Sequence, residues 1–186
     1  MNFHAIARLH GLWLLAALLV PQPAEAGEMI GRASVVDGDT IEIRGEPVRL
    51  HGIDAPESGQ LCLDKTAARY RCGQRAAFAL ADKMGAANVR CDLMDRDQYG
   101  RHIGRCFLGD VDLNHWMVRE GQAVAYKRFS AEYLPAEMRA QEQKSGVWQG
   151  QFTLPWEWRQ GERLQSAAPT QKSGCAIKGN ISENGK

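Results

Sequence analysis

Hydrophobic and polar residues alternate along the chain between residues 29 and 53. The alternation predicts three short strands at residues 31–36, 40–43 and 48–53, with Arg44-Gly45-Glu46 as a hairpin turn between the last two. Neighbouring side chains of a strand point to opposite faces, so each run can turn one face towards a core. This part of the chain is therefore expected to form a three-stranded meander.

Hydrophobic residues recur at helical spacing in three later segments, each of which ends at a glycine. These segments are residues 72–85, 112–121 and 135–146. The second opens with an aspartate that can cap a helix, and the third opens with a proline, which suits a first turn. Two further strand-like runs, 89–94 and 102–108, lie between the first two helices. Five strands and three helices make an α+β protein and are compatible with a small closed barrel.

The length of 186 residues suits one compact domain with extensions. Residues 1–26 have the pattern of a signal peptide, because Arg8 precedes an apolar run at 11–20 and Ala24-Glu25-Ala26 fits the small-residue rule for cleavage. A membrane anchor is the alternative, but the run has about ten residues where a spanning helix needs roughly twenty. We therefore expect an exported protein, periplasmic or extracellular, without a membrane anchor after cleavage.

The remaining chain divides into two parts. Residues 27–152 carry the predicted strands and helices and are expected to form the domain. Residues 153–186 are expected to be a segment with two tryptophans, a polar linker and a short tail. The formal net charge is +1, which excludes a strong long-range field that gathers nucleic acid. A polyanionic partner would have to be held by a local basic patch or by a metal.

Five cysteines in a protein expected to be exported indicate disulfide bonds. Cys62 and Cys72 flank a polar loop just before the first predicted helix. Cys91 and Cys106 lie in the two later strand-like runs, which could pair in one sheet. We expect these two pairs to form the disulfides, and Cys175 is left over in the tail. Zinc is the alternative, but the C-x2-C spacing typical of structural zinc is absent.

Three short clusters hold the residues that could do chemistry. They are Asp37-Gly38-Asp39-Thr40 at the turn between the first two predicted strands, the run from Arg49 to Glu57 at the end of the third, and Asp97-Gln98-Tyr99-Gly100-Arg101 at the start of the fifth. Each cluster alone is an ordinary turn or loop with solvated charges. Together they combine acidic oxygens, which hard divalent cations bind, with arginines, which suit phosphate oxygens.

These residue types fit the hydrolysis of a phosphodiester. Asp39 and Asp54 could bind calcium together with a backbone carbonyl and water. Glu57 could be the general base that activates water. Arg49 and Arg101 could neutralise the charge that builds on the phosphate oxygens.

In order and spacing the three clusters resemble the staphylococcal nuclease family, and the resemblance covers residues 29–150. It continues through Leu113-Asn114 and residues 118–126, and it closes with Gly146-Val147-Trp148. The family fold is a five-stranded OB-like β-barrel with three α-helices. That fold agrees with the elements predicted from periodicity alone.

The resemblance implies a secreted, calcium-dependent phosphodiesterase that hydrolyses DNA and RNA. It further implies endonucleolytic cleavage that leaves 3′-phosphate ends. Asp39, Asp54 and the backbone carbonyl of Ala55 would bind the Ca2+ ion. Ala55 stands where the founding member has threonine, which should cost little because the contact uses the backbone.

The same resemblance implies the remaining site residues. Glu57 would be the general base, and Arg49 and Arg101 would grip the phosphate. Tyr99 and Tyr126 would line the nucleotide pocket, where they could stack on bases or contact phosphate. Packing into the core is the alternative role for each tyrosine.

A non-catalytic module that binds nucleic acid or protein on the same fold is the alternative function. That alternative predicts that the catalytic residues are missing, whereas all five of the charged residues named above are present. The sequence implies no stable protein partner beyond the DNA and RNA substrates, so a monomer is expected.

Overall fold

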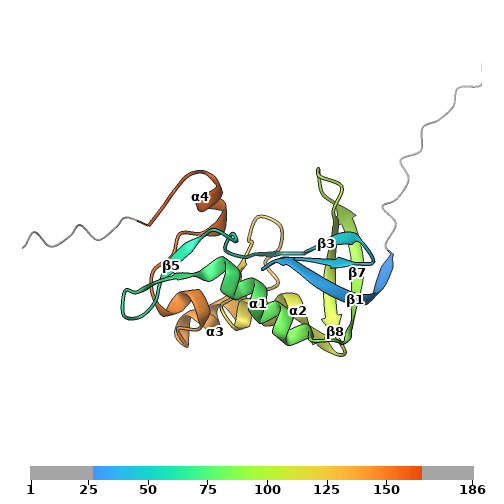
Figure 1. Cartoon of the computed structure of the whole chain (residues 1–186), viewed down its shortest axis with the longest axis horizontal. Coiled ribbons are helices and arrows are strands. Elements are labelled where there is room, and N and C mark those ends of the chain that lie inside the picture. The colour runs from blue at the N-terminus through green and yellow to red at the C-terminus, as the bar shows by residue number, and fades with distance from the viewer. Residues whose placement is uncertain (1–26, 165–186) are drawn as a thin grey trace, which may run out of the picture.

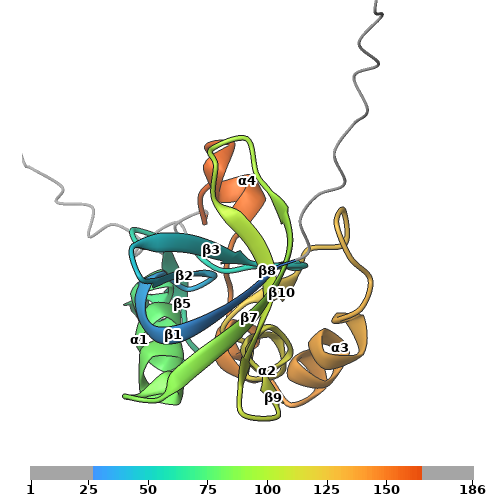
Figure 2. The same ribbon diagram turned by 90° about the vertical axis from the view of Figure 1, so that its right-hand side faces the viewer.

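The centre of the molecule is a closed β-barrel, described by a computed structural model that covers residues 27–164. Its strands run in the order β3-β2-β1-β7-β8, and a parallel pairing between β3 and β8 closes the sheet on itself (Figures 1 and 2). The barrel strands are β1 (Glu28–Asp37), β2 (Thr40–Ile43), β3 (Glu46–Leu50), β7 (Asn88–Arg96) and β8 (His102–Leu108). The five-stranded OB-like barrel expected from the sequence is confirmed.

Alternation along β2 and β3 produces the barrel core. The inward side chains are Ile41, Ile43, Val48 and Leu50, each of them at most 1% exposed. Between Val48 and Leu50, Arg49 therefore points away from this core. The same alternation that buries the hydrophobic residues thus delivers a charged side chain to the opposite face.

The strand predicted for residues 48–53 is broken in the structure. Gly52 has a φ of +72°, a left-handed conformation that glycine adopts without steric cost. Beyond this turn, β4 (Ile53–Asp54) leaves the barrel and pairs with β10 (Val124–Ala125). The break matters for the site because Asp54 then lies in β4, which pairs outside the barrel sheet, rather than in a continuation of β3.

Within the described residues the three helices that the sequence predicted are present, two of them packed on barrel strands, and a fourth short helix follows them. α1 packs along β1, while α2 contacts β8 and α3 (Figure 1). Asp112 caps α2, because its carboxylate accepts a hydrogen bond of 2.9 Å from the backbone N–H of His115. The bounds are α1 (Cys72–Met84), α2 (Leu113–Arg119), α3 (Leu134–Glu142) and α4 (Pro155–Arg159), with a 3-10 helix η1 (Gly146–Gln149).

Two details of the helix prediction need correction. α3 ends at Glu142 rather than near Gly146, because Gly146 opens η1 and packs closely against Gly121. A Cβ on Gly146 would lie 2.1 Å from the carbonyl oxygen of Gly121. α4 was not predicted, since five residues are too few to show a helical period. Residues 153–159 pack on the domain, and the proposed boundary at residue 152 stays a prediction.

A small second cluster of hydrophobic residues lies beside the barrel. The polar loop expected between Cys62 and Cys72 contains a short hairpin made of β5 (Leu61–Leu63) and β6 (Arg69–Arg71). We call the group around it the satellite cluster. Its members are Cys62, Cys72 and Val147 with the partly buried Tyr70, Trp148 and Phe152.

Both expected disulfides are formed. Cys62–Cys72 joins β5 to the first residue of α1. Cys91–Cys106 joins directly opposite residues of β7 and β8, so the expectation that these two strands pair is also confirmed. Cys175, like the predicted signal peptide at residues 1–26 and the tail at 165–186, lies outside the described residues.

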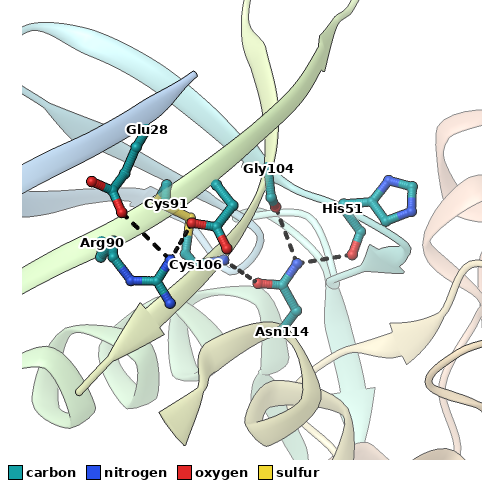
Figure 3. The surroundings of a disulfide bond; sticks show 8 residues. Glu28, His51, Arg90, Cys91, Gly104, Cys106 and Asn114 are labelled. Atoms are coloured by element: carbon teal, nitrogen blue, oxygen red, sulfur yellow. Dashed lines mark hydrogen bonds and ion pairs between the residues drawn. A yellow bond between two sulfur atoms is a disulfide. The ribbon is translucent and has the colours of Figure 1, made fainter. Parts of the chain in front are cut away.

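The buried side chain of Asn114 ties α2 to two parts of the barrel (Figure 3). Its amide donates to the carbonyl oxygen of His51 at 2.9 Å and to that of Gly104 at 3.2 Å. Its side-chain oxygen accepts from the Cys106 N–H at 3.1 Å. Asn114 therefore fixes the turn that precedes β4, next to the second chemical cluster.

Removal of either disulfide is expected to lower the free energy of unfolding by about 3 kcal/mol, because closing loops of 10 and 15 residues restricts the unfolded chain by similar amounts. The test is urea denaturation of the double variants Cys62→Ala/Cys72→Ala and Cys91→Ala/Cys106→Ala. A loss below about 1 kcal/mol in either would contradict this account.

Within residues 27–164, no helix has the length and apolar character needed to cross a bilayer.

Candidate active site

A cavity of about 730 Å³ brings the three sequence clusters together. Its walls come from the turn after β1, the chain between β3 and Glu57, the β7–β8 turn and α4. α4 and the β7–β8 turn rise on the same side of the molecule in both views (Figures 1 and 2). The predicted site residues that line the cavity are Asp39, Arg49, Ala55, Glu57, Tyr99, Arg101 and Tyr126.

The Asp-Gly-Asp-Thr turn holds Asp39 against the second cluster. The Asp39 N–H donates to Asp37 Oδ1 at 3.0 Å, and Asp39 Oδ2 accepts from the Ala55 N–H at 2.9 Å. A Cβ on Gly38 would lie 2.7 Å from the Ala55 Cβ and 2.8 Å from that of Ala76. Glycine is thus needed at position 38 for the two clusters to approach this closely.

Arg49 links two buried carboxylates. Its Nη1 donates to Asp39 Oδ1 at 2.8 Å and its Nη2 donates to Asp54 Oδ1 at 2.9 Å. Asp39 is 3% exposed and Asp54 is fully buried. Burial alone would lower the pKa of Arg49, but the charges of Asp39 and Asp54 raise it. Arg49 is therefore a permanent cation between these two carboxylates.

Asp39 sits where a negative charge is costly. Burial raises the pKa of Asp39 to about 7. The negative charges of Asp37 and Asp54 act in the same direction, while Arg49 and the Ala55 N–H act against them. A further positive charge at this point would stabilise the ionised carboxylate.

Glu57 lies at the edge of the cavity on a tightly held turn. Its N–H donates to Gln60 Oε1 at 3.2 Å, and its carbonyl accepts from the Gln60 N–H at 2.7 Å. The start of α1 packs on the same backbone, since a Cβ on Gly73 would lie 1.8 Å from the Glu57 carbonyl oxygen. The Glu57 side chain is 32% exposed, so its carboxylate can meet water in the cavity.

Arg101 enters the cavity from the turn between β7 and β8. Its Nε donates to Asp97 Oδ2 at 2.7 Å, and its backbone N–H donates to Asp97 Oδ1 at 3.0 Å. Its guanidinium lies 5.7 Å from the centre of the Tyr99 ring. The structure therefore brings Arg101 into the cavity but pairs it with Asp97 rather than with the buried carboxylates.

The two predicted tyrosines lie in different surroundings. Tyr99 is 75% exposed at the tip of the β7–β8 turn, so core packing does not account for it. Tyr126 stacks on Trp156 of α4, with ring centres 5.3 Å apart and planes inclined by 6°. The exposed Phe129 meets Tyr126 edge-on at 4.9 Å. Flat aromatic surfaces of this kind can stack on nucleobases.

Arg159 of α4 is a site residue that the sequence analysis missed. Its Nη1 donates to Asp54 Oδ1 at 3.0 Å and its Nη2 donates to Asp54 Oδ2 at 2.7 Å. The same Nη1 donates to Glu57 Oε1 at 2.7 Å. Burial opposes the charge, but the hydrogen bonds to Asp54 and Glu57 raise the pKa of Arg159. A separation of 105 residues from Asp54 leaves no local pattern that could have revealed the contact.

The oxygen ligands fit a hard divalent cation, although no three His, Cys, Asp or Glu side chains of residues 27–164 form a ready-made metal cluster. Asp39 and Asp54 are buried carboxylates joined through Arg49, and Ala55 lies against Asp39. The three carboxylates of Asp39, Asp54 and Glu57 form ion pairs with two guanidinium groups, those of Arg49 and Arg159. The surplus of negative charge and the all-oxygen chemistry suit calcium or magnesium.

Buried carboxylates and arginines that converge on an open cavity at a small barrel are typical of an enzyme that acts on phosphate esters. A family model described as "Staphylococcal nuclease homologue" matches residues 47–150. The chain therefore belongs to the staphylococcal nuclease family.

Curated relatives extend the similarity beyond the matched segment. "Micrococcal nuclease" of Shigella flexneri is 32% identical over 180 residues, which cover 86% of this chain and 96% of that protein. An "Uncharacterized endonuclease" of Escherichia coli O157:H7 is 30% identical over 154 residues, 78% of this chain and 94% of its own length. "Succinoglycan biosynthesis protein ExoI" of Rhizobium meliloti (strain 1021) is 45% identical over 142 residues, 74% of each chain.

Proposed function

We propose that this protein is an exported, calcium-dependent nuclease that hydrolyses DNA and RNA within the chain and leaves 3′-phosphate ends. As a member of its family, with relatives named nuclease and endonuclease, it is a phosphodiester-hydrolysing nuclease. The observation that carries the proposal is the bonded array of Asp39, Arg49 and the buried Asp54, of which Asp39 and Arg49 line one cavity with Glu57. Export is supported by the two disulfides, which persist in oxidising compartments.

In this proposal Asp39, Asp54 and the carbonyl of Ala55 hold the cation. Bound calcium supplies a Lewis acid that stabilises charge on the phosphate. Glu57 takes a proton from the water that attacks phosphorus. Arg49 and Arg101, which line the same cavity, bind the phosphate oxygens more strongly as charge develops.

The proposed 3′-phosphate ends define which bond is broken. Water adds to phosphorus, the bond from phosphorus to the 5′ oxygen breaks, and the leaving oxygen takes up a proton. The phosphate then stays on the 3′ oxygen. Tyr99 and Tyr126 are proposed to orient the nucleotides by stacking, with Trp156 as the support behind Tyr126.

The direct test is degradation of supercoiled DNA and of RNA by the purified, oxidised protein with calcium, with magnesium and with a chelator. Calcium-dependent cutting, with products that a polymerase extends only after phosphatase treatment, would support the proposal. A folded, disulfide-bonded protein that binds nucleic acid but does not cut it would favour the non-catalytic binding module instead. A monomer is expected by light scattering.

Replacing Asp39 with asparagine is expected to raise the calcium concentration for half-maximal activity by about tenfold or more, because one charged ligand is lost. The shape of the side chain is retained, so the maximal rate should change less. Calcium titration of DNA cleavage measures both quantities. Asp95→Asn is the matched control, since Asp95 lines the same cavity but is exposed and contacts Arg96 rather than the buried carboxylates. A normal calcium response in Asp39→Asn would remove Asp39 from the cation site.

A further inference from the structure

Arg159 occupies the oxygens that a cation would need. Both oxygens of Asp54 accept hydrogen bonds from its guanidinium fork, at 3.0 and 2.7 Å. Asp54 Oδ1 also accepts from Arg49. Asp54 is fully buried, and both of its oxygens are in hydrogen bonds with arginines. A cation that binds Asp54 therefore competes with a guanidinium for these oxygens, and Oδ1 already accepts from both arginines.

Of the two arginines, Arg159 is the one that can move. Arg49 lies within β3, binds Asp39 as well as Asp54, and has a side chain that is 20% exposed. Arg159 is the last residue of a five-residue helix and has a side chain that is 38% exposed. Its departure breaks no strand pairing, whereas a shift of Arg49 would disturb the barrel.

The chain places Arg159 at the site through specific contacts. Gln60 binds the Glu57 turn and also donates to the carbonyl of Thr153 at 2.6 Å. Pro155 is buried at the start of α4, and Trp156 stacks on Tyr126. All of α4 lies beyond the segment that the family model matches. These contacts hold the segment from Thr153 to Arg159 against the domain and place Arg159 at the site.

The guanidinium fork suits two partners equally well. It matches the two oxygens of a carboxylate, and it matches two oxygens of a phosphodiester in the same bidentate manner. Arg159 lines the cavity that also holds Arg49 and Arg101. Once a cation neutralises Asp54, two anions remain for Arg159 at this cavity: the Glu57 carboxylate, which it already contacts at 2.7 Å, and the substrate phosphate.

We propose that Arg159 is a third active-site arginine that exchanges partners, holding Asp54 and Glu57 before a cation binds and gripping the substrate phosphodiester afterwards. The proposal rests on the proposed function, because it presumes a cation at Asp54. Arg159 thereby weakens cation binding in the free enzyme and strengthens substrate binding in the loaded one. Removal of its contact also frees the Glu57 carboxylate to accept a proton from water.

The test compares Arg159→Gln with the wild-type chain by isothermal titration with calcium chloride. The variant is expected to bind calcium about tenfold more tightly, because the competing cation is gone. Arg163→Gln is the matched control and should bind as the wild type does, since Arg163 contacts backbone carbonyls of Trp158 and Glu162. A merely structural role for Arg159 would loosen the site and weaken calcium binding, which is the opposite sign.

A second measurement tests the other half of the exchange. In calcium, Arg159→Gln should bind a single-stranded phosphorothioate oligonucleotide about tenfold more weakly than the wild type does. Arg159→Lys keeps the charge without the fork and should give intermediate values in both titrations, which guards against a folding defect of the first variant.

The outcomes separate this inference from the proposed function. Equal or weaker calcium binding by Arg159→Gln, with clear binding by the wild type, overturns the exchange and leaves the calcium enzyme in place. Failure of both proteins to bind calcium overturns both. Tighter calcium binding with unchanged oligonucleotide affinity overturns the phosphate contact.

Discussion

Replacing Glu57 with glutamine is expected to lower the rate of DNA cleavage by about a hundredfold or more while the fold stays intact. Glutamine cannot take the proton of the attacking water, but its side-chain oxygen can still accept the hydrogen bond from Arg159 Nη1. The two hydrogen bonds that join the Glu57 backbone to Gln60 are untouched. The comparison is cleavage of plasmid DNA at saturating calcium, with the thermal unfolding midpoint measured beside it.

A matched control is available on α4. Glu157 lies two residues before Arg159 and does not line the cavity, so Glu157→Gln should cut at the wild-type rate. If Glu57→Gln retained activity within a factor of a few, the proton would have to go elsewhere and the assignment of the base would be wrong.

Gly73→Ala is expected to damage both stability and catalysis from a position outside the cavity lining. The added methyl group would lie 1.8 Å from the Glu57 carbonyl oxygen and 2.7 Å from that of Pro56. Either α1 or the Glu57 turn must shift, because backbone atoms cannot yield as a flexible side chain does. We expect a loss of about 1–3 kcal/mol in the free energy of unfolding, and a displacement near 1 Å can cost about a hundredfold in rate.

The same turn supplies the control for this prediction. A Cβ on Gly59 would meet nothing within 4 Å, so Gly59→Ala should leave both the urea unfolding curve and the cleavage rate unchanged. Equal behaviour of the two alanine variants would show that the approach of α1 does not position Glu57.

The barrel could be predicted from the sequence because its strands have strong local patterns. Alternation marked β2 through residues such as Ile41 and Ile43, and Asp112 marked the start of α2 by its capping chemistry. The break after β3 was missed, since a left-handed turn at Gly52 looks the same in sequence as a glycine within a strand. α4 was missed because it is too short to show a helical period, and packing of Trp156 on Tyr126 holds it in place.

Some residues of the site could likewise be predicted from local sequence clusters, and one could not. Asp39, Arg49 and Glu57 lie in short clusters, and the structure brings all three to one cavity. Arg159 had no such signal, because its contact with Asp54 depends on how the chain returns to the barrel after α3. Local chemistry can thus be found from neighbouring residues, whereas a residue supplied by a distant segment requires the tertiary structure.

The parallel pairing of β3 with β8 is the seam at which the barrel closes, and it passes through the site. Arg49 lies opposite Ile103, two residues beyond Arg101, so the seam sets how far apart the two arginines stand. Without this pairing, Arg49 and Arg101 are not held at the same cavity, even if the β2–β3 and β7–β8 hairpins are formed. The rate at which nuclease activity returns during refolding therefore depends on when β3 pairs with β8. Fluorescence and circular dichroism would report this pairing together with the other folding steps.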